Sequence, residues 1–266
     1  MKKTIYLLCS LALFVACCNV PGAPDAKNAK TIRLVSYNVG AFHKSGHSTI
    51  SMIADMLGEM QADVVGIQEV DSCTTRTGKV DQLDSLCTYL GGWCGKYGDA
   101  MPYKGGKYGV SVLAKPEYTV LATDVLHLPK GTGNEPRAVA VVEYEDFVFA
   151  STHIDFGEAN QMMQLQLVCQ YFDSLAYQKP VFLVGDFNAY PDSKAISYMQ
   201  ESWTLISVPD NSFPSHAPDR CIDFVFARNA ASVKVVGGKV CTVFKQGDVA
   251  VASDHLPIYV DVKIEK

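Results

Sequence analysis

The sequence predicts an α/β (α+β) fold in which mixed or antiparallel β-sheets carry helices on their outer faces. Apolar runs of strand length outnumber stretches with helical periodicity, and many successive strands are separated by short loops. Hydrophobic residues make up 48% of the 266 residues and charged residues 19%, which is enough apolar material for a substantial core. A doubly wound parallel sheet would require a helix between nearly all successive strands, and this pattern is not observed.

The strands are predicted from short runs that either alternate between apolar and polar residues or are continuously apolar. A continuous run such as DVVGIQEV indicates a strand that is buried on both faces. Strands are expected at residues 31–38, 63–70, 109–114, 118–121, 138–143, 147–153, 180–186, 221–227, 233–236, 240–244 and 258–262.

The helices are predicted where apolar residues recur at a spacing of three or four. They are expected at residues 48–60, 82–90, 158–177 and 192–200. The last of these follows Pro191 and begins with an aspartate-type cap at Asp192. Residues 91–107 and 128–136 have no regular pattern and are expected to form loops.

The N-terminus has the layout of a secretory signal. Lys2 and Lys3 precede an apolar run at residues 5–16, which is shorter than the roughly 20 residues that a transmembrane helix needs. The sequence Phe-Val-Ala-Cys at residues 14–17 resembles a bacterial lipobox, with Phe14 in place of the usual leucine. We therefore expect a signal peptide at residues 1–16, lipidation at Cys17 and a tether at residues 17–30, and hence a lipoprotein of the outer membrane or periplasm, or otherwise a secreted protein.

Charge and cysteine usage restrict the function classes. The net charge is −5, and it becomes −8 without the first 30 residues, which hold four Lys and one Asp. Proteins that bind long duplex nucleic acid usually carry a basic surface, so this charge disfavours a nuclease of that kind. The chain has no CxxC pair, which disfavours a zinc ribbon or thioredoxin-like site, while Cys87 and Cys94 are close enough in sequence to close a small loop.

Polar side chains stand at the ends of several predicted strands, where functional groups are often placed on a rigid scaffold. They are Asn38, Glu69, His153, Asp186, Asp223, Asp254 and His255. A carboxylate such as Glu69, at the end of an apolar strand, would be costly to bury alone and becomes tolerable when it coordinates a cation.

Six short motifs that include these residues occur in a fixed order. They are YN at residues 37–38, IQE at 67–69, STH at 151–153, GDFN at 185–188, IDFVF at 222–226 and SDHLP at 253–257. The series resembles that of the endonuclease/exonuclease/phosphatase superfamily, which includes deoxyribonuclease-like nucleases, abasic-site endonucleases, inositol-polyphosphate phosphatases and neutral sphingomyelinases. Each of the shorter motifs alone is weak evidence for the family, and GDFN and SDHLP together carry the resemblance.

The resemblance implies a single domain at residues 31–266, because its site residues come from both ends of the chain. It also implies a four-layer sandwich of two packed mixed β-sheets flanked by helices. The implied activity is hydrolysis of phosphoester bonds with Mg²⁺ or Mn²⁺ as the cofactor.

The resemblance also assigns roles to the strand-end residues. Glu69 would be the principal metal ligand, with Asp254 and Asn38 completing or supporting the metal site. His255 would contact the scissile phosphate or act as an acid/base, with Asp223 orienting its ring. Asp186 would orient or deprotonate the attacking water or act on the leaving oxygen, and Asn188 and His153 would donate hydrogen bonds to phosphate oxygens.

Two further features bear on the substrate. Asn38 and Arg137 are expected to contact it, although an arginine at a strand start is equally often exposed. Many bacterial relatives carry a basic residue early in the helix that follows the THxD segment, whereas this chain has EANQMMQLQ there, so no substrate contact is expected at that place.

The sequence therefore predicts a metal-dependent phosphoester hydrolase and leaves three hypotheses about its function. The substrate is a small phosphoester or a lipid headgroup; alternatively, the protein is an extracellular nuclease that acts on DNA or RNA, or a non-catalytic surface binding protein that retains the fold. The domain is expected to be monomeric and to meet the membrane through its N-terminal lipid.

Overall fold

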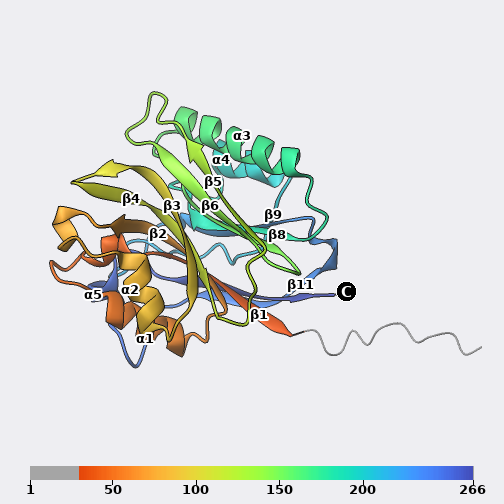
Figure 1. The fold of residues 1–266 in the computed structure, drawn as a ribbon. Coiled ribbons are helices and arrows are strands. Elements are labelled where there is room, and N and C mark those ends of the chain that lie inside the picture. The colour runs from red at the N-terminus through yellow and green to blue at the C-terminus, as the bar shows by residue number, and fades with distance from the viewer. Residues whose placement is uncertain (1–29, 266) are drawn as a thin grey trace, which may run out of the picture.

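The computed structural model describes residues 30–265 and places them in two β-sheets that pack face to face (Figure 1). The first sheet has the spatial order β11 (Val233–Val240), β12 (Ile258–Ile264), β1 (Thr31–Asn38), β2 (Val64–Ser72), β4 (Gly106–Ala114) and β3 (Cys94–Tyr103). The second has the order β5 (Ala122–Leu128), β6 (Arg137–Glu143), β7 (Val148–His153), β8 (Val181–Asp186), β10 (Asp223–Arg228) and β9 (Thr204–Leu205).

Both sheets are mixed. Strand β1 runs parallel to β2, and β7 runs parallel to β8, whereas the other neighbouring strands pair antiparallel. The predicted fold class is therefore confirmed.

Helices cover the outer faces of the two sheets and complete the four layers (Figure 1). Helices α1 (Ile50–Glu59) and α2 (Gln82–Tyr89) pack against the first sheet, and α3 (Glu158–Leu175) and α4 (Lys194–Gln200) pack against the second. The remaining helical elements are short: η2 (Gly40–Phe42), η3 (Thr75–Thr77), η4 (Ala230–Ser232) and α5 (Val249–Ala252). Among the described residues, no helix combines the length and the apolar character needed to cross a membrane.

Strand β1 shows why the central strands are apolar on both sides. Leu34 packs into the core between the two sheets, whereas Val35 and Tyr37 pack into the separate core beneath α1 and α2. Successive side chains of a strand point to opposite faces, so a strand in the middle of four layers buries both sets.

The two sheets approach each other closely at Gly66 of β2. A Cβ atom added there would lie 2.2 Å from Cγ2 of Val184 in β8, which is far inside van der Waals contact. The absence of a side chain at this position therefore allows β2 and β8 to come together, and the ends of these two strands carry site residues.

Several predicted elements were wrong in extent. Residues 91–107 were expected to be a loop but contain strand β3, which is mostly exposed or partly exposed and includes two glycines, Gly95 and Gly98, so its sequence has no hydrophobic alternation. Residues 118–121 form no strand, because β5 begins at Ala122. Residues 233–236 and 240–244 were expected to be two strands, but one strand, β11, runs from Val233 to Val240 with a register shift between Val235 and Gly237.

Two local predictions also need correction. Helix α4 is capped by Ser193 rather than Asp192, since the Ser193 hydroxyl accepts a hydrogen bond from the Ile196 backbone N–H at 3.3 Å. Cys87 and Cys94 are both free thiols, so they do not close the small loop that their spacing allowed. The predicted signal peptide, the lipidation at Cys17 and residues 17–29 of the predicted tether lie outside the described residues.

Candidate active site

The strand pairing brings the polar strand-end residues to one edge of the sandwich. His153 at the end of β7 is in register with Asp186 at the end of β8, because these strands are parallel. Asp223 at the start of β10 is also in register with Asp186, because β10 is antiparallel to β8. The end of the first sheet joins them there, since Asn38 at the end of β1 contacts Asp186.

Glu69 is placed by a β-bulge near the end of β2. The register between β2 and β4 shifts between Gln68 and Val70, and Glu69 adopts a φ of +59°. This left-handed conformation costs roughly 1–3 kcal/mol for a residue other than glycine, and such strain often occurs at functional sites. Gln68 is buried between the sheets and donates to the Ser151 hydroxyl at 3.0 Å, which fixes the backbone beside the bulge.

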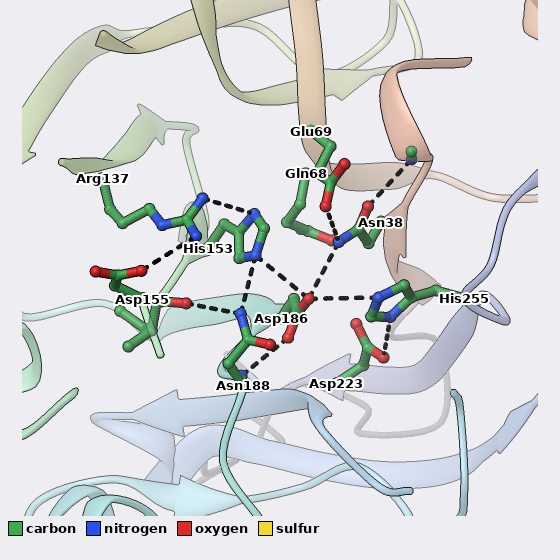
Figure 2. Close-up of polar contacts among 12 residues, drawn as sticks. Asn38, Gln68, Glu69, Arg137, His153, Asp155, Asp186, Asn188, Asp223 and His255 are labelled. Carbon is green, nitrogen blue, oxygen red and sulfur yellow. Dashed lines mark hydrogen bonds and ion pairs between the residues drawn. The ribbon is translucent and has the colours of Figure 1, made fainter. Parts of the chain in front are cut away.

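Asn38 joins the two sheets through its side-chain amide. Its Nδ2 donates to Glu69 Oε1 at 3.2 Å and to Asp186 Oδ2 at 3.1 Å, and its Oδ1 accepts from the Gly40 backbone N–H at 3.1 Å (Figure 2). This bond from Gly40 sets the orientation of the amide. The Asn38 side chain therefore holds the two carboxylates in place rather than presenting its own oxygen to the site.

His255 and Asp223 form a buried pair. His255 Nδ1 lies 2.9 Å from Asp223 Oδ2, which also accepts a hydrogen bond from the Ser212 hydroxyl at 2.5 Å. The Nε2 atom of His255 lies 3.5 Å from Asp186 Oδ2, on the other side of the ring (Figure 2). Ser212, which contacts the site through Asp223, belongs to none of the sequence motifs.

The charges of this group perturb one another. Burial lowers the pKa of His255, but the carboxylates of Asp223 and Asp186 outweigh burial and raise that pKa to about 9. Burial raises the pKa of Asp186 to about 7, against the opposing effect of His255, and Asp223 adds to the rise. Perturbed pKa values that arise from burial and specific charged partners are common at functional sites.

His153 contacts Asp186 as His255 does, and it links Asp186 to Asn188 and Arg137. Its Nε2 lies 3.0 Å from Asn188 Nδ2 and 3.4 Å from Asp186 Oδ2, and its Nδ1 lies 3.4 Å from Arg137 Nη1. Burial lowers the pKa of His153 well below its usual value, and the positive charges of Arg137 and His255 lower it further. The His153 ring is therefore neutral around physiological pH.

Arg137 is 3% exposed and depends on a residue to which the sequence assigned no role, Asp155. Its guanidinium contacts Asp155 Oδ1 at 3.4 Å and Glu135 Oε2 at 3.1 Å. Asp155 Oδ2 also accepts hydrogen bonds from the backbone N–H groups of Asn134 and Glu135 and from Asn160 Nδ2. The sequence did contain a signal for Asp155, since it is the last residue of the THxD segment that begins at the end of β7.

Asp254 stands apart from the connected network. Its carboxylate forms an ion pair with Lys44, a residue of the loop after η2 that sequence reasoning did not select. Its Oδ1 lies 3.5 Å from the position that a Cβ atom on Gly40 would occupy, so it borders the backbone next to Asn38. The structure therefore places Asp254 beside the network, with no described contact to Glu69.

Most of the predicted site residues come together. Arg137 contacts His153, and through it joins one continuous chain of contacts (Figure 2). The other members of this chain are Asn38, Glu69, Asp186, Asn188, Asp223 and His255.

The donor set suits a hard divalent cation. Single ligand atoms of Asp186, Asp223 and His255 lie within 4.8 Å of one another, and Glu69 adds a carboxylate nearby through Asn38. Asp223 Oδ1 is buried and has no hydrogen-bond partner among the described residues, so a carboxylate oxygen is available. Carboxylate oxygen is the ligand that Mg²⁺ and Mn²⁺ prefer, and the residues present therefore fit such an ion.

The fold and this site agree with a comparison against protein families. The model of the endonuclease/exonuclease/phosphatase family matches residues 35–255, and the chain belongs to this family. Members of the family hydrolyse phosphoester bonds, with phosphatases and nucleases among them, and they usually depend on a divalent metal. No curated protein matches the chain by sequence.

Solved structures share the fold at low sequence identity. An endonuclease/exonuclease/phosphatase from Bacteroides vulgatus is 19% identical and has a TM-score of 0.72, with 89% of this chain and 100% of that chain covered. A mannosyl-6-phosphatase from Bacteroides thetaiotaomicron is 18% identical with a TM-score of 0.71, covering 87% and 99%. The human Nocturnin catalytic domain with bound sulfate is 17% identical with a TM-score of 0.69, covering 91% and 99%.

Proposed function

We propose that this chain is a divalent-metal-dependent hydrolase of phosphoester bonds. The observation that carries the proposal is the continuous set of contacts from Glu69 through Asn38 and Asp186 to the His255–Asp223 pair. In the reaction a water oxygen forms a bond to phosphorus, the ester P–O bond breaks, and the departing alcohol oxygen takes a proton.

Glu69 is the proposed principal ligand of Mg²⁺ or Mn²⁺, with Asp254 beside it. The bound ion would supply charge neutralisation for the phosphoryl oxygens. Asn38 supports this site by holding Glu69 and Asp186 with its amide N–H groups. For Asp254 to serve, its carboxylate must exchange Lys44 for the metal.

Arg137, His153 and Asn188 are the proposed binders of the phosphate oxygens. Arg137 Nε is buried and has no hydrogen-bond partner among residues 30–265, so it is a donor that a ligand can satisfy. A buried donor without a partner costs about 1–3 kcal/mol, and a phosphate oxygen placed beside it would recover that cost. Guanidinium groups suit phosphate because they present several donors in one plane.

Asp186 and His255 are the proposed proton-handling residues. Asp186 lies between His153 and His255, where it can orient or deprotonate the attacking water or act on the leaving oxygen. Because His255 Nδ1 is occupied by Asp223, its Nε2 is the atom left for a phosphate oxygen or a proton transfer.

The test is hydrolysis of a chromogenic bis-aryl phosphodiester and of an aryl phosphate with Mg²⁺ or Mn²⁺, before and after chelation. We expect Glu69→Ala and His255→Ala each to lower kcat by about 100-fold or more, which is the usual cost of losing such a group. The exposed Glu145→Ala is the matched control. Calorimetry should show weaker Mg²⁺ binding by the Glu69 variant, and unchanged activity in both site variants would refute the assignment.

The net charge of −8 for residues 31–266 supports a small phosphoester or lipid headgroup over long nucleic acid. Parallel assays on plasmid, single-stranded DNA, RNA, inositol phosphates and sphingomyelin separate these substrates. A non-catalytic binding protein is the remaining alternative; the retained site residues argue against it, and a lack of metal binding in calorimetry would favour it.

We further propose that the protein is exported and anchored through lipid at Cys17, and that its domain is monomeric. The support is the charged and apolar layout of residues 1–16, followed by the lipobox-like sequence. Metabolic labelling with a fatty acid should mark the protein but not Cys17→Ser, and size-exclusion chromatography of residues 31–266 should give the monomer mass.

A further inference from the structure

A pocket of about 410 Å³ opens beside the phosphate-binding side of the site. Arg137, His153 and Glu69 form the end of the pocket that belongs to the site. The rest of its wall consists of Arg76, Met101, Tyr103, Tyr108, Asn134, Glu135 and Phe156. A substrate whose phosphate lies against Arg137 and His153 would therefore place its alcohol portion in this pocket.

Charge in the pocket wall is already balanced. Arg76 donates through Nε and Nη2 to Asp71 at 2.7 and 2.8 Å, and the Asp71 carboxylate is fully buried. Arg137 also has carboxylate partners, Glu135 at 3.1 Å and Asp155 at 3.4 Å. Because each guanidinium has a carboxylate partner, the wall offers no excess positive charge for a second phosphate.

Aromatic stacking is also limited. The ring of Tyr103 carries the Arg76 guanidinium at 4.6 Å and the Lys104 ammonium at 5.3 Å, and it contacts Tyr108 at a tilt of 52°. These cations compete with a nucleobase for the Tyr103 faces, which would otherwise be the natural stacking platform. Phe156 is 55% exposed and offers one apolar surface at the rim.

The remaining groups suit hydroxyls. Glu135 supplies carboxylate oxygens, and its side chain is 39% exposed, while the exposed side chain of Asn134 supplies both a donor and an acceptor. Arg76 keeps further N–H donors beyond those bound to Asp71, because a guanidinium has five. Sugar hydroxyls donate and accept at once, so a wall with both kinds of partner matches them.

We propose that this pocket binds the alcohol portion of the substrate and that this portion is a sugar, so the enzyme acts on a phosphorylated carbohydrate. The proposal rests on the function proposed above, since it places the sugar relative to the scissile phosphate. Asn134 and Glu135 bind ring hydroxyls, and Phe156 covers the apolar C–H face of the ring.

The experiment compares kcat/KM for a hexose 6-phosphate, a nucleoside 5′-monophosphate and an aryl phosphate, all with Mg²⁺. We expect the hexose phosphate to exceed the nucleotide by about tenfold or more, because unmatched polar groups in a pocket are costly. Asn134→Ala and Glu135→Gln should each lower the hexose-to-aryl ratio of kcat/KM by about tenfold, chiefly through KM, as expected for one lost charged or polar hydrogen bond. The exposed Glu145→Gln should leave that ratio unchanged.

The outcomes separate the two proposals. Hydrolysis of the aryl phosphate with a preference for the nucleotide, or with a ratio that neither variant changes, overturns the sugar pocket and leaves the hydrolase intact. If the protein hydrolyses none of these three monoesters but does hydrolyse the bis-aryl phosphodiester, the sugar pocket is overturned and the hydrolase stands. If it hydrolyses neither the monoesters nor the diester, both proposals are overturned. Glu135→Gln can disturb Arg137, with which Glu135 forms an ion pair. Asn134 is exposed, so Asn134→Ala tests the sugar pocket without that disturbance.

Discussion

Asp155 organises one side of the site, and its replacement by asparagine tests that role. One of its oxygens accepts from the backbone N–H of Asn134 at 2.8 Å, the backbone N–H of Glu135 at 3.2 Å and Asn160 Nδ2 at 2.8 Å, and the other oxygen faces Arg137. The amide can keep its oxygen toward three donors only by turning its NH₂ group toward the guanidinium. Asp155→Asn therefore leaves the buried charge of Arg137 with Glu135 as its one remaining carboxylate partner.

Breaking a buried ion pair costs about 3–5 kcal/mol, and we expect the lower end, about 3 kcal/mol, because Glu135 stays in place. Urea unfolding followed by circular dichroism measures this loss. Since Arg137 also loses its orientation, kcat/KM for an aryl phosphate should fall by about tenfold or more. The exposed Asp192→Asn is the matched control and should change stability by less than about 0.5 kcal/mol. A loss below about 1 kcal/mol for Asp155→Asn, with unchanged activity, would refute this account of the carboxylate.

Two further predictions concern packing and pH. Gly66→Ala should destabilise the protein by about 1–3 kcal/mol or more, since the new Cβ would lie 2.2 Å from Val184 Cγ2. The control Gly58→Ala in α1 meets nothing within 4 Å and should raise stability by up to about 1 kcal/mol. Equal effects of the two substitutions in thermal unfolding would contradict the close approach of the sheets. In chelator-treated protein, the folded-state pKa of His255, about 9, lies above its unfolded value of about 6.5, so the contribution of its charged form is fully present below about pH 6.5 and is lost as pH rises through about 9. The free energy of unfolding of His255→Gln should therefore be lower than that of the wild type at pH 6, and this difference should shrink as pH rises through about 9. A difference that is constant from pH 6 to pH 10 would show that the ionised ring does not stabilise the fold.

The predicted and observed elements differ where local sequence carries little information. Strands β1, β2 and β8 were predicted within one or two residues, since their side chains are buried on both faces. Strand β3 was missed because it is a partly exposed edge strand, and one of its glycines, Gly98, lies against Ala140 of β6. That glycine position is set by a neighbouring sheet, which no window along the chain can register.

The same distinction applies to the site. The motifs identified Glu69, Asp186 and His255 because each combines a characteristic residue with characteristic neighbours. Lys44 and Arg76 belong to no such motif. Their positions near the site depend on ion pairs, Lys44 with Asp254 and Arg76 with Asp71. An ion pair between residues as distant in sequence as Lys44 and Asp254 depends on the complete fold.

The sequence by itself predicted the class of fold, most of the residues that meet at the candidate site and the chemistry to expect from them. Burial on two faces sets the composition of a strand, and the order of the motifs sets which strand ends carry function. The tertiary structure decided how these groups are arranged: Asn38 donates to two carboxylates, Asp155 contacts Arg137, and a pocket adjoins Arg137 and His153. These properties arise from distances between segments, and such distances exist only once the two sheets have packed together.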